Sequence, residues 1–216
     1  MDKQNKKTDQ RKISESVTSR IKNSDRVREK HQLIAKKAAR LFIKKGYPQT
    51  TIREISKATG MAMGNLYDYI SKKEDILCLV FDVYHRHIED SAIVGKYKET
   101  DDPHRELQSF IHGSLQNVRE FHDEIILMYR ESGLLPKKNL KQAMQKELSE
   151  IRVLEKIIRR GIERKVFKAQ DPFFAASMVF YQLVIPALRG WTFKGKYSEI
   201  KVNKLLEDYI IKNILA

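Results

Sequence analysis

"TTIREISKATGMAMGNLYDYISKKEDIL", residues 50–77, contains two short helical patterns separated by a tight turn at Gly60. Thr51, followed three residues later by Glu54, forms a capping box that starts the first helix. Leu66 supplies an inward contact for the second helix. Two short helices joined by a glycine turn are typical of a helix-turn-helix, in which the first helix supports the second and the second enters the DNA major groove.

The second short helix carries polar side chains where a core helix would carry leucines. Its outward positions are expected to be Asn65, Tyr67, Asp68 and Tyr69. Their hydroxyl and amide groups can reach phosphates and base edges. Lys72 and Lys73 open the next helix, where ammonium groups and free backbone N–H groups attract a phosphate. The alternative is a helical hairpin with partly buried tyrosines and no DNA contact.

Positive charge is concentrated in residues 1–80, which hold 19 Lys and Arg against 9 Asp and Glu, a net charge of +10. The remaining residues carry only +4 of the total of +14. This asymmetry favours a polyanion partner for the amino-terminal third, although a lysine-rich solvated surface gives the same count. The chain has no run of 18 apolar residues and no apolar signal-peptide core, so we expect a cytoplasmic protein with no membrane partner.

The whole chain has helical periodicity, with no convincing alternating segment, which predicts an all-α protein. We expect a mobile basic arm at 1–25, a three-helix helix-turn-helix domain at 26–80 and a larger helical domain at 81–216. Long amphipathic helices in the last part are expected at about 102–119, 121–133, 136–165, 172–192 and 197–215. A second capping box, formed by Ser71 and Glu74, is expected before the helix that joins the two domains.

Residues 29–80 resemble the DNA-binding domain of the TetR/AcrR family of transcriptional regulators. The matching pieces are "AARLFIKKGYPQTTIREISKATG", "MGNLYDYI" and "SKKEDIL", in the family's order and spacing. The resemblance implies a homodimer that binds a palindromic site in double-stranded DNA. It also implies DNA contacts from Thr50, Thr51 and Arg53 on the supporting helix, from Met63, Gly64, Asn65, Tyr67, Asp68 and Tyr69 on the reading helix, and from Lys73.

Two positions depart from the family's usual pattern. Ala62 stands where Ser or Thr is usual, so the reading helix lacks a side-chain cap that contributes about 1 kcal/mol. Met63 stands where a polar or basic residue is common, and it can offer only apolar contact, for example to a thymine methyl group.

The resemblance implies that the second half binds a ligand and dimerises. Two terminal helices have broad apolar faces, which predict a four-helix interface between two copies of the chain. The alternative is that both faces complete the core of the monomer. These faces consist of Phe173, Phe174, Met178, Tyr181, Ile185 and Leu188 on one helix, and Ile200, Leu205, Tyr209, Ile210 and Ile214 on the other.

A ligand pocket with apolar walls, flexible methionines and a few polar groups is expected between the helices of the second half. Its candidate residues are Phe110, Ile111, Ser114, Met128, Tyr129, Leu140, Met144, Met178 and Gln182. The stretches "ILMYRESGLLPKKNLKQ" and "IPALRGWTFKGKYSEI" resemble the family members associated with fatty-acid and acyl-CoA metabolism. This fainter resemblance implies a small amphipathic effector such as acyl-CoA, with Arg130, Arg189, Lys194 or Lys196 as partners for its phosphates.

Other functional classes find little support in the sequence. "HGSL" at 112–115 lacks the glycines of a nucleophile elbow, and no glycine-rich phosphate loop follows a strand, so we expect no catalytic residues and no cofactor. His85 and Glu89 are four residues apart, but no second pair supports a metal site. The resemblance to the TetR/AcrR family therefore implies a ligand-responsive repressor. The alternatives are a multidrug-sensing repressor and an effector-free architectural DNA-binding protein of the nucleoid.

Overall fold

The computed structural model describes residues 17, 19–90, 98–168 and 171–215, without the side chains of residues 89 and 90. The described part of the chain is almost entirely helical, and its only β-type pairing is an isolated bridge between Phe167 and Leu215. The all-α prediction is confirmed. The bounds of the predicted helices in the second half are correct to within a few residues.

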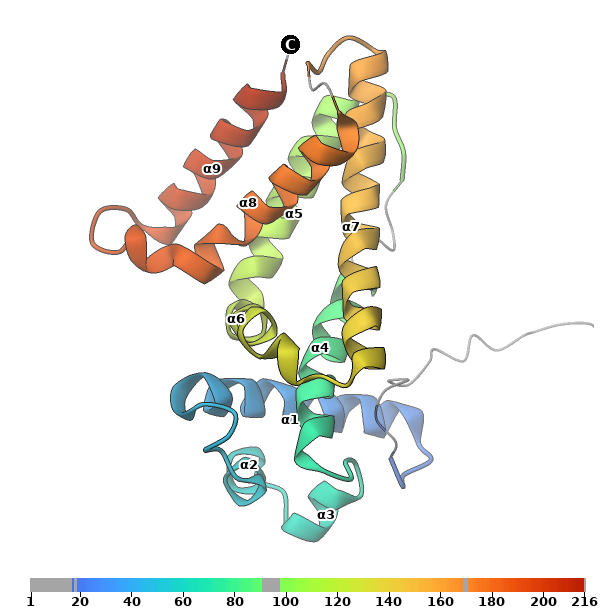
Figure 1. Cartoon of the computed structure of the whole chain (residues 1–216), viewed down its shortest axis with the longest axis vertical. Coiled ribbons are helices and arrows are strands. Elements are labelled where there is room, and N and C mark those ends of the chain that lie inside the picture. Colours follow the sequence, from blue (N-terminus) through green and yellow to red (C-terminus); the bar gives the residue numbers. More distant parts are fainter. Residues whose placement is uncertain (1–16, 18, 91–97, 169–170, 216) are drawn as a thin grey trace, which may run out of the picture.

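The amino-terminal head consists of α1 (Ser24–Lys45), α2 (Ile52–Thr59), α3 (Met63–Tyr67) and the beginning of α4 (Lys73–Asp90). The body contains the rest of α4 together with α5 (Pro103–Glu120), α6 (His122–Glu131), η1 (Ser132–Leu134), α7 (Lys137–Glu163), α8 (Pro172–Arg189), η2 (Gly190–Thr192) and α9 (Glu199–Ile214). Figure 1 shows α2 and α3 at one end of the molecule, with α1 crossing between them and the body.

The helix ends follow local chemistry. Gly46, with φ +88°, ends α1 and donates its backbone N–H to the Phe42 carbonyl oxygen. Aspartates cap α5 and α8, each directly before a proline at the first helical position, where the missing N–H has no cost. The mobile arm expected at 1–25 lies mostly outside the described residues, and α1 already begins at Ser24.

Two apolar clusters stabilise the molecule. One joins the head to α4, α6 and the end of α8, and the other holds α5, α7, α8 and α9 together. Position 161 in α7, beside the second cluster, requires a glycine because the ring of Phe167 occupies the space that a side chain would take. An added Cβ would lie 1.9 Å from the Cδ2 atom of Phe167. The free thiol of Cys78 is buried in the first cluster, and burial raises its pKa to about 11.

Candidate nucleic-acid interface and effector site

The capping box predicted for α2 is present. Thr51 Oγ1 accepts from the backbone N–H of Glu54 at 3.2 Å, and Glu54 Oε2 accepts from the backbone N–H of Thr51 at 2.9 Å. The Glu54 carboxylate also pairs with Lys45 at the end of α1, and these bonds lower its pKa to about 2. Arg53, in the first turn of the helix, is exposed. The first helix of the motif is therefore fixed to α1, while the Arg53 side chain remains exposed to solvent.

The turn between α2 and α3 is closed by its own side chains. Gly60 has left-handed backbone angles, with φ +70° and ψ +13°, which favour glycine. Ser56 Oγ donates to the Met61 carbonyl oxygen at 2.5 Å, and the Thr59 hydroxyl donates to the carbonyl of Ile55 at 3.0 Å. These bonds set the angle at which α3 leaves α2.

The reading helix α3 has only five residues, and four of them are exposed: Met63, Gly64, Asn65 and Tyr67. Leu66 is fully buried and anchors the helix to the head. Ala62 stands at the amino-terminal cap position and offers no side-chain hydrogen bond. A Cβ on Gly64 would have no protein atom within 4 Å, so the position of Gly64 faces open space on the outer surface of the helix.

Two of the residues expected to contact DNA are buried. Tyr69 is fully buried, its carbonyl oxygen accepts from His31 Nε2 at 2.9 Å, and its ring packs edge-on against the His31 ring. Tyr69 lies beyond the end of α3, where the chain turns, and its side chain therefore points into the core and not along the outer face of the helix. Thr50 is 1% exposed and donates its hydroxyl to the Gly46 carbonyl oxygen at 2.9 Å. The prediction that the Tyr69 side chain faces outward is wrong, and the burial of the Thr50 side chain contradicts the DNA contact that the resemblance implied for it.

Lys73 does not extend freely toward solvent. Its ammonium group donates to the carbonyl oxygens of Tyr47 and Pro48 and lies 4.4 Å from the centroid of the Tyr47 ring. Burial lowers its pKa. The phosphate contact expected from Lys73 is thus in competition with a bond that ties α4 to the loop between α1 and α2.

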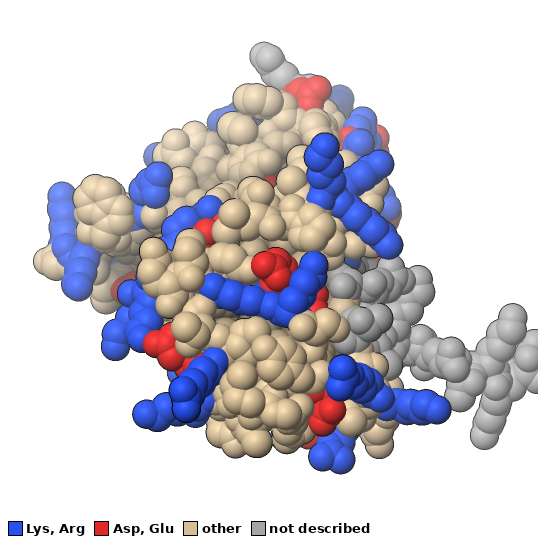
Figure 2. Space-filling view, turned by 60° about the horizontal axis from the view of Figure 1, so that its bottom comes forward, with Lys and Arg blue, Asp and Glu red and all other residues tan. Residues whose placement is uncertain are grey.

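The second predicted capping box is wrong. Asp75, and not Glu74, accepts the free N–H groups before α4, from Ser71 at 2.7 Å and from Lys72 at 3.0 Å. Lys72 itself is exposed. Figure 2 brings the head forward and shows Lys and Arg side chains on both flanks of an uncharged surface, as expected for a surface that meets phosphates at its edges.

Sequence reasoning missed two contacts that position the head. Ser19 Oγ and the Arg20 backbone N–H both donate to the carbonyl oxygen of Asp68, directly after α3. In the body, Arg130 Nη2 on α6 donates to the Phe42 carbonyl oxygen near the end of α1, at 2.9 Å. Neither contact leaves a periodic signal in the sequence, because both end on a backbone carbonyl of a distant segment.

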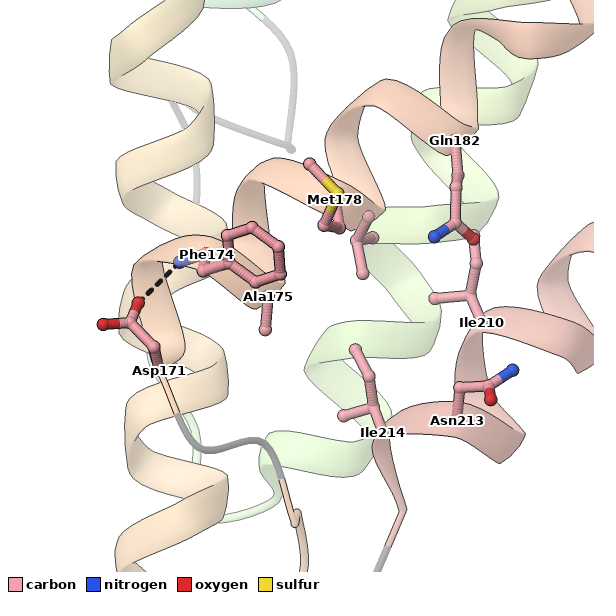
Figure 3. A pocket seen from close by; sticks show the side chains of 9 residues that line it. Asp171, Phe174, Ala175, Met178, Gln182, Ile210, Asn213 and Ile214 are labelled. Atoms are coloured by element: carbon pink, nitrogen blue, oxygen red, sulfur yellow. Dashed lines mark hydrogen bonds between the residues drawn. The ribbon is translucent and has the colours of Figure 1, made fainter.

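A cleft of about 370 Å³ lies between α8 and α9 (Figure 3). Its lining residues are Asp171, Phe174, Ala175, Met178, Val179, Gln182, Ile210, Asn213 and Ile214. Most of this surface is apolar. The buried Oε1 atom of Gln182 has no hydrogen-bond partner within the described part of the chain. The cleft can therefore take an apolar group and one hydrogen-bond donor.

The structure distributes the expected pocket residues over several places. Met178 and Gln182 line the cleft, and Phe110 and Ile111 belong to the apolar cluster that also contains the cleft residues Val179, Ile210 and Ile214. Ser114 is half-buried on the same helix as Phe110. Met128 and Leu140 pack in the other cluster. Tyr129 and Met144 are 41% and 63% exposed. The expected set does not form one cavity.

A group of polar side chains brings α4, α6, α7 and α8 together. Tyr129, Glu147 and Tyr181 lie near one another, and the pKa of Tyr129 is raised mainly by burial and next by the nearby Glu147 carboxylate. Burial also raises the pKa of Glu147. His85 on α4 is 3% exposed, neither ring nitrogen has a partner among the described residues, and burial lowers its pKa to about 3. No group of three potential metal ligands occurs in the described ranges.

The segment from α8 through η2 to α9 exposes large apolar side chains. Phe174, Trp191, Ile200 and Tyr209 are each 60% exposed or more. Of the apolar faces expected on these helices, Ile210 and Ile214 are buried in the monomer, and most of the others are exposed. The segment Pro172–Thr192 is long and apolar enough to cross a membrane by length and composition alone, a test that core helices of soluble proteins also pass.

Comparison with known proteins identifies the family. Residues 34–78 match "Bacterial regulatory proteins, tetR family", and residues 100–212 match "Tetracyclin repressor-like, C-terminal domain". The chain is 24% identical over 206 residues to the HTH-type transcriptional regulator HbdR of Aromatoleum sp. (strain CIB), covering 94% of this chain and 85% of that protein.

Solved structures share the fold. A TetR-family regulator, PfmR from Thermus thermophilus, superposes with a TM-score of 0.72 at 24% identity, over 83% of this chain and 97% of that one. AibR, solved with isovaleryl coenzyme A and operator DNA, superposes with a TM-score of 0.71 at 18% identity, over 86% of this chain and 97% of the AibR chain. A putative fatty acid metabolism regulator of Clostridium perfringens gives 0.65 at 20% identity, over 85% and 99%. The chain belongs to the TetR family of DNA-binding transcriptional regulators, which are not enzymes.

Proposed function

We propose that this regulator is a repressor that leaves its operator when an amphipathic, acyl-CoA-like effector binds the body. The observation that carries this proposal is the double connection between body and head. Helix α4 is continuous from the head to its contacts with α6 and α7, and Arg130 joins α6 to the Phe42 carbonyl oxygen in α1. Helix α8, which lines the cleft described above, packs against α6. A ligand that displaces α8, and α6 with it, therefore moves both α1 and α4.

The proposed operator contacts come from the exposed part of the motif. Arg53 and Thr51 meet the backbone, and Met63, Asn65 and Tyr67 face the groove floor or its edges. In a homodimer formed through α8 and α9, two such heads reach successive major grooves, about 34 Å apart, on a palindromic site. The head is taken as residues 26–80 and the body as 81–216. The regulator acts in the cytoplasm, where its operator is found.

The Asn65 side chain is the proposed base reader because its amide can form two hydrogen bonds to adenine. Asn65→Ala is expected to cost about 1–3 kcal/mol on the selected site and almost nothing on mixed-sequence DNA. Anisotropy titrations on both duplexes measure this. Equal losses on the two DNAs would assign Asn65 to the backbone instead.

The effector class rests on the solved relatives and on the apolar interior. AibR was solved with an acyl-CoA, and the cleft between α8 and α9 offers apolar walls with amide groups from Gln182 and Asn213. Exposed basic groups at Arg189, Lys194 and Lys196 follow the end of α8 and can meet phosphates. Arg130 is removed from this role because its guanidinium group already binds Glu131 and the Phe42 carbonyl oxygen.

A second candidate is a cationic amphipathic effector, as in a multidrug sensor. The group formed by Tyr129, Glu147 and Tyr181 supports it, because a half-buried carboxylate beside partly exposed aromatic rings suits a positively charged ligand. A cation there would also offset the burial that raises the pKa of Glu147.

The test begins with a DNA site selected from a random library by the full chain. The complex is then titrated with acyl-CoAs of increasing chain length, with free CoA, and with a cationic amphiphile. Release that grows with acyl length, by about 5- to 150-fold in DNA affinity, and is absent with CoA supports the proposal. Release by the cationic amphiphile alone supports the second candidate. Release by none of them indicates a DNA-binding protein without an effector.

A further inference from the structure

An apolar stripe runs along the outer face of α8. Its members are exposed large side chains spaced by four, three and four residues: Phe174, Met178, Tyr181 and Ile185. This spacing places them along one seam of the helix, which is the pattern with which two helices interlock. The stripe is therefore a surface suited to packing against another helix.

A second copy of the chain fits this stripe. Dimers are typical of the TetR family, to which the chain belongs. In a two-fold dimer the same surface of both copies meets, and residues at equal distances on opposite sides of the axis face each other. None of the four stripe residues is charged, so two stripes can meet without the cost of burying a charge.

The cleft between α8 and α9 opens beside the stripe, and Phe174 and Met178 line both surfaces. In Figure 3 the Gln182 amide points toward Ile210 on α9. The buried Oε1 atom of Gln182 has no hydrogen-bond partner among the described residues. A buried acceptor without a donor is destabilising, so the cleft suits an apolar group that brings one N–H group with it.

Trp191 is a side chain of that kind. Indole combines a large apolar ring with one N–H donor and no acceptor. Trp191 lies in η2, is 73% exposed, and makes no hydrogen bond from its ring to any described residue. It follows Met178 by 13 positions, which is roughly 20 Å along the helix, so it cannot reach the cleft of its own chain. Figure 1 shows η2 at the opposite end of α8 from the start of that helix.

We propose that, in the homodimer, Trp191 of the partner subunit fills this cleft and donates its indole N–H to Gln182 Oε1. A two-fold axis perpendicular to α8 makes the two copies of this helix antiparallel. If the axis crosses α8 near Ile185, positions 178 and 191 lie about equally far from it on opposite sides, so each end of one helix meets the other end of its partner.

This inference rests on the proposed homodimer and on the proposed effector cleft, and it adds a means of regulation. The acyl group of an effector and the partner's Trp191 are alternative occupants of the same apolar walls. An effector that enters the cleft therefore replaces a contact between the two subunits. The dimer without effector keeps this contact and is the form that binds the operator.

Trp191 is the only tryptophan of the chain, so the intrinsic fluorescence of the unmodified protein reports on this side chain alone. Analytical ultracentrifugation gives the dissociation constant of the dimer, and emission and acrylamide quenching are measured above and below it. Ile185→Glu places a charge at the proposed axis and supplies the spectrum of the monomer. The dimer is expected to emit at shorter wavelength and to be quenched more slowly. Equal emission and quenching in dimer and monomer would overturn the inference.

Variants test the two parts of the contact. Trp191→Ala is expected to weaken dimerisation by about 10- to 100-fold, whereas Leu134→Ala, an exposed apolar residue on η1, leaves it unchanged. Trp191→Phe keeps a ring without the N–H group, and Gln182→Leu removes the acceptor. Because both remove the same hydrogen bond, the double variant is expected to lose less than the two single losses combined. Additive losses, or an unweakened Trp191→Ala dimer, contradict the contact.

Titration with acyl-CoA separates this inference from the proposed function. Acyl-CoA is expected to shift the emission of Trp191 to longer wavelength, and Trp191→Ala is expected to bind acyl-CoA several-fold more tightly because no side chain competes. Weaker binding by Trp191→Ala overturns the competition. If Trp191 is protected in the dimer but no acyl-CoA releases DNA, the subunit contact stands and the proposed effector fails. If acyl-CoA releases DNA while Trp191 is equally quenched in dimer and monomer, the proposed function stands and this inference fails.

Discussion

Lys73 has two possible roles, a contact to a DNA phosphate and a bond inside the protein, and its contacts in the structure favour the bond inside the protein. Its ammonium group bonds to the carbonyl oxygens of Tyr47 and Pro48 and lies over the Tyr47 ring, so it joins the start of α4 to the loop between α1 and α2. Lys73→Met keeps the length of the side chain and removes the charge. Lys72→Met is the matched control, because Lys72 is the exposed lysine immediately before it.

The expected loss follows from these contacts. A hydrogen bond from a charged donor contributes about 1.5–3 kcal/mol, and an exposed cation–π contact about 0.5–1 kcal/mol. Because Lys73 is half-exposed, solvent screening reduces the total, and we expect about 1–2 kcal/mol. For a chain of this size, this corresponds to a fall in melting temperature of roughly 2–8 °C.

Thermal unfolding and DNA affinity across a salt series measure both roles at once. Lys73→Met is expected to lower the melting temperature and leave the slope of log K against log salt unchanged. Lys72→Met is expected to leave the melting temperature unchanged and reduce the slope by about one, if its ammonium group meets a phosphate. The reasoning fails if Lys73→Met melts like the wild type and loses about one unit of slope.

Three other changes test the fold. Gly161→Ala is expected to destabilise the protein by about 1–3 kcal/mol in urea unfolding, because its Cβ would overlap Phe167, whereas Gly133→Ala meets no atom within 4 Å; equal effects of the two changes would contradict this packing. Ala62→Ser is expected to raise the free energy of unfolding by about 1 kcal/mol by capping α3, and a decrease would show that the hydroxyl does not reach the free N–H groups. Below about pH 6.5 the unfolded chain protonates His85, whereas the folded chain does so only near pH 3. As the pH is lowered between these two values, the free energy of unfolding therefore decreases by up to about 1.4 kcal/mol per pH unit. His85→Leu is expected to lack this component, and an identical pH profile in the variant would refute the burial argument.

The helical fold could be predicted because its signals are local. Helix ends at Gly46, Asp102 and Asp171 each combine a residue that stops or caps a helix with a change in apolar periodicity, and the structure places helix boundaries at all three. The capping box of Thr51 and Glu54 has the same local character. These features need only neighbours in sequence, so a single chain reveals them.

The DNA-binding surface was predicted less completely because it depends on distant partners. Tyr69 is a residue type that can contact DNA bases or phosphates. However, His31 in α1, 38 positions earlier, binds the Tyr69 carbonyl oxygen, and α3 ends two residues before Tyr69. Periodicity extended α3 through Tyr69 and so placed its side chain on the outer face. The bonds of Lys73 could not be predicted for the same reason, since its partners lie 25 and 26 residues away in the sequence. The ligand residues were selected by type alone, and residue type does not determine which helices enclose a cavity.

The short reading helix explains why so many contacts converge on it. An isolated helix of five residues is unstable in water, so α3 takes its orientation from the rest of the head. Leu66 holds its inner side, the bonds from Ser19 and Arg20 to Asp68 hold its end, and Lys73 fixes the adjoining helix α4 to the loop before α2. A head tied in this way moves as one unit. The proposed effector therefore does not need to rearrange α3: in the proposed homodimer, a displacement of α4 in the body changes the distance between two intact reading heads, and this change alone weakens binding to a palindromic operator.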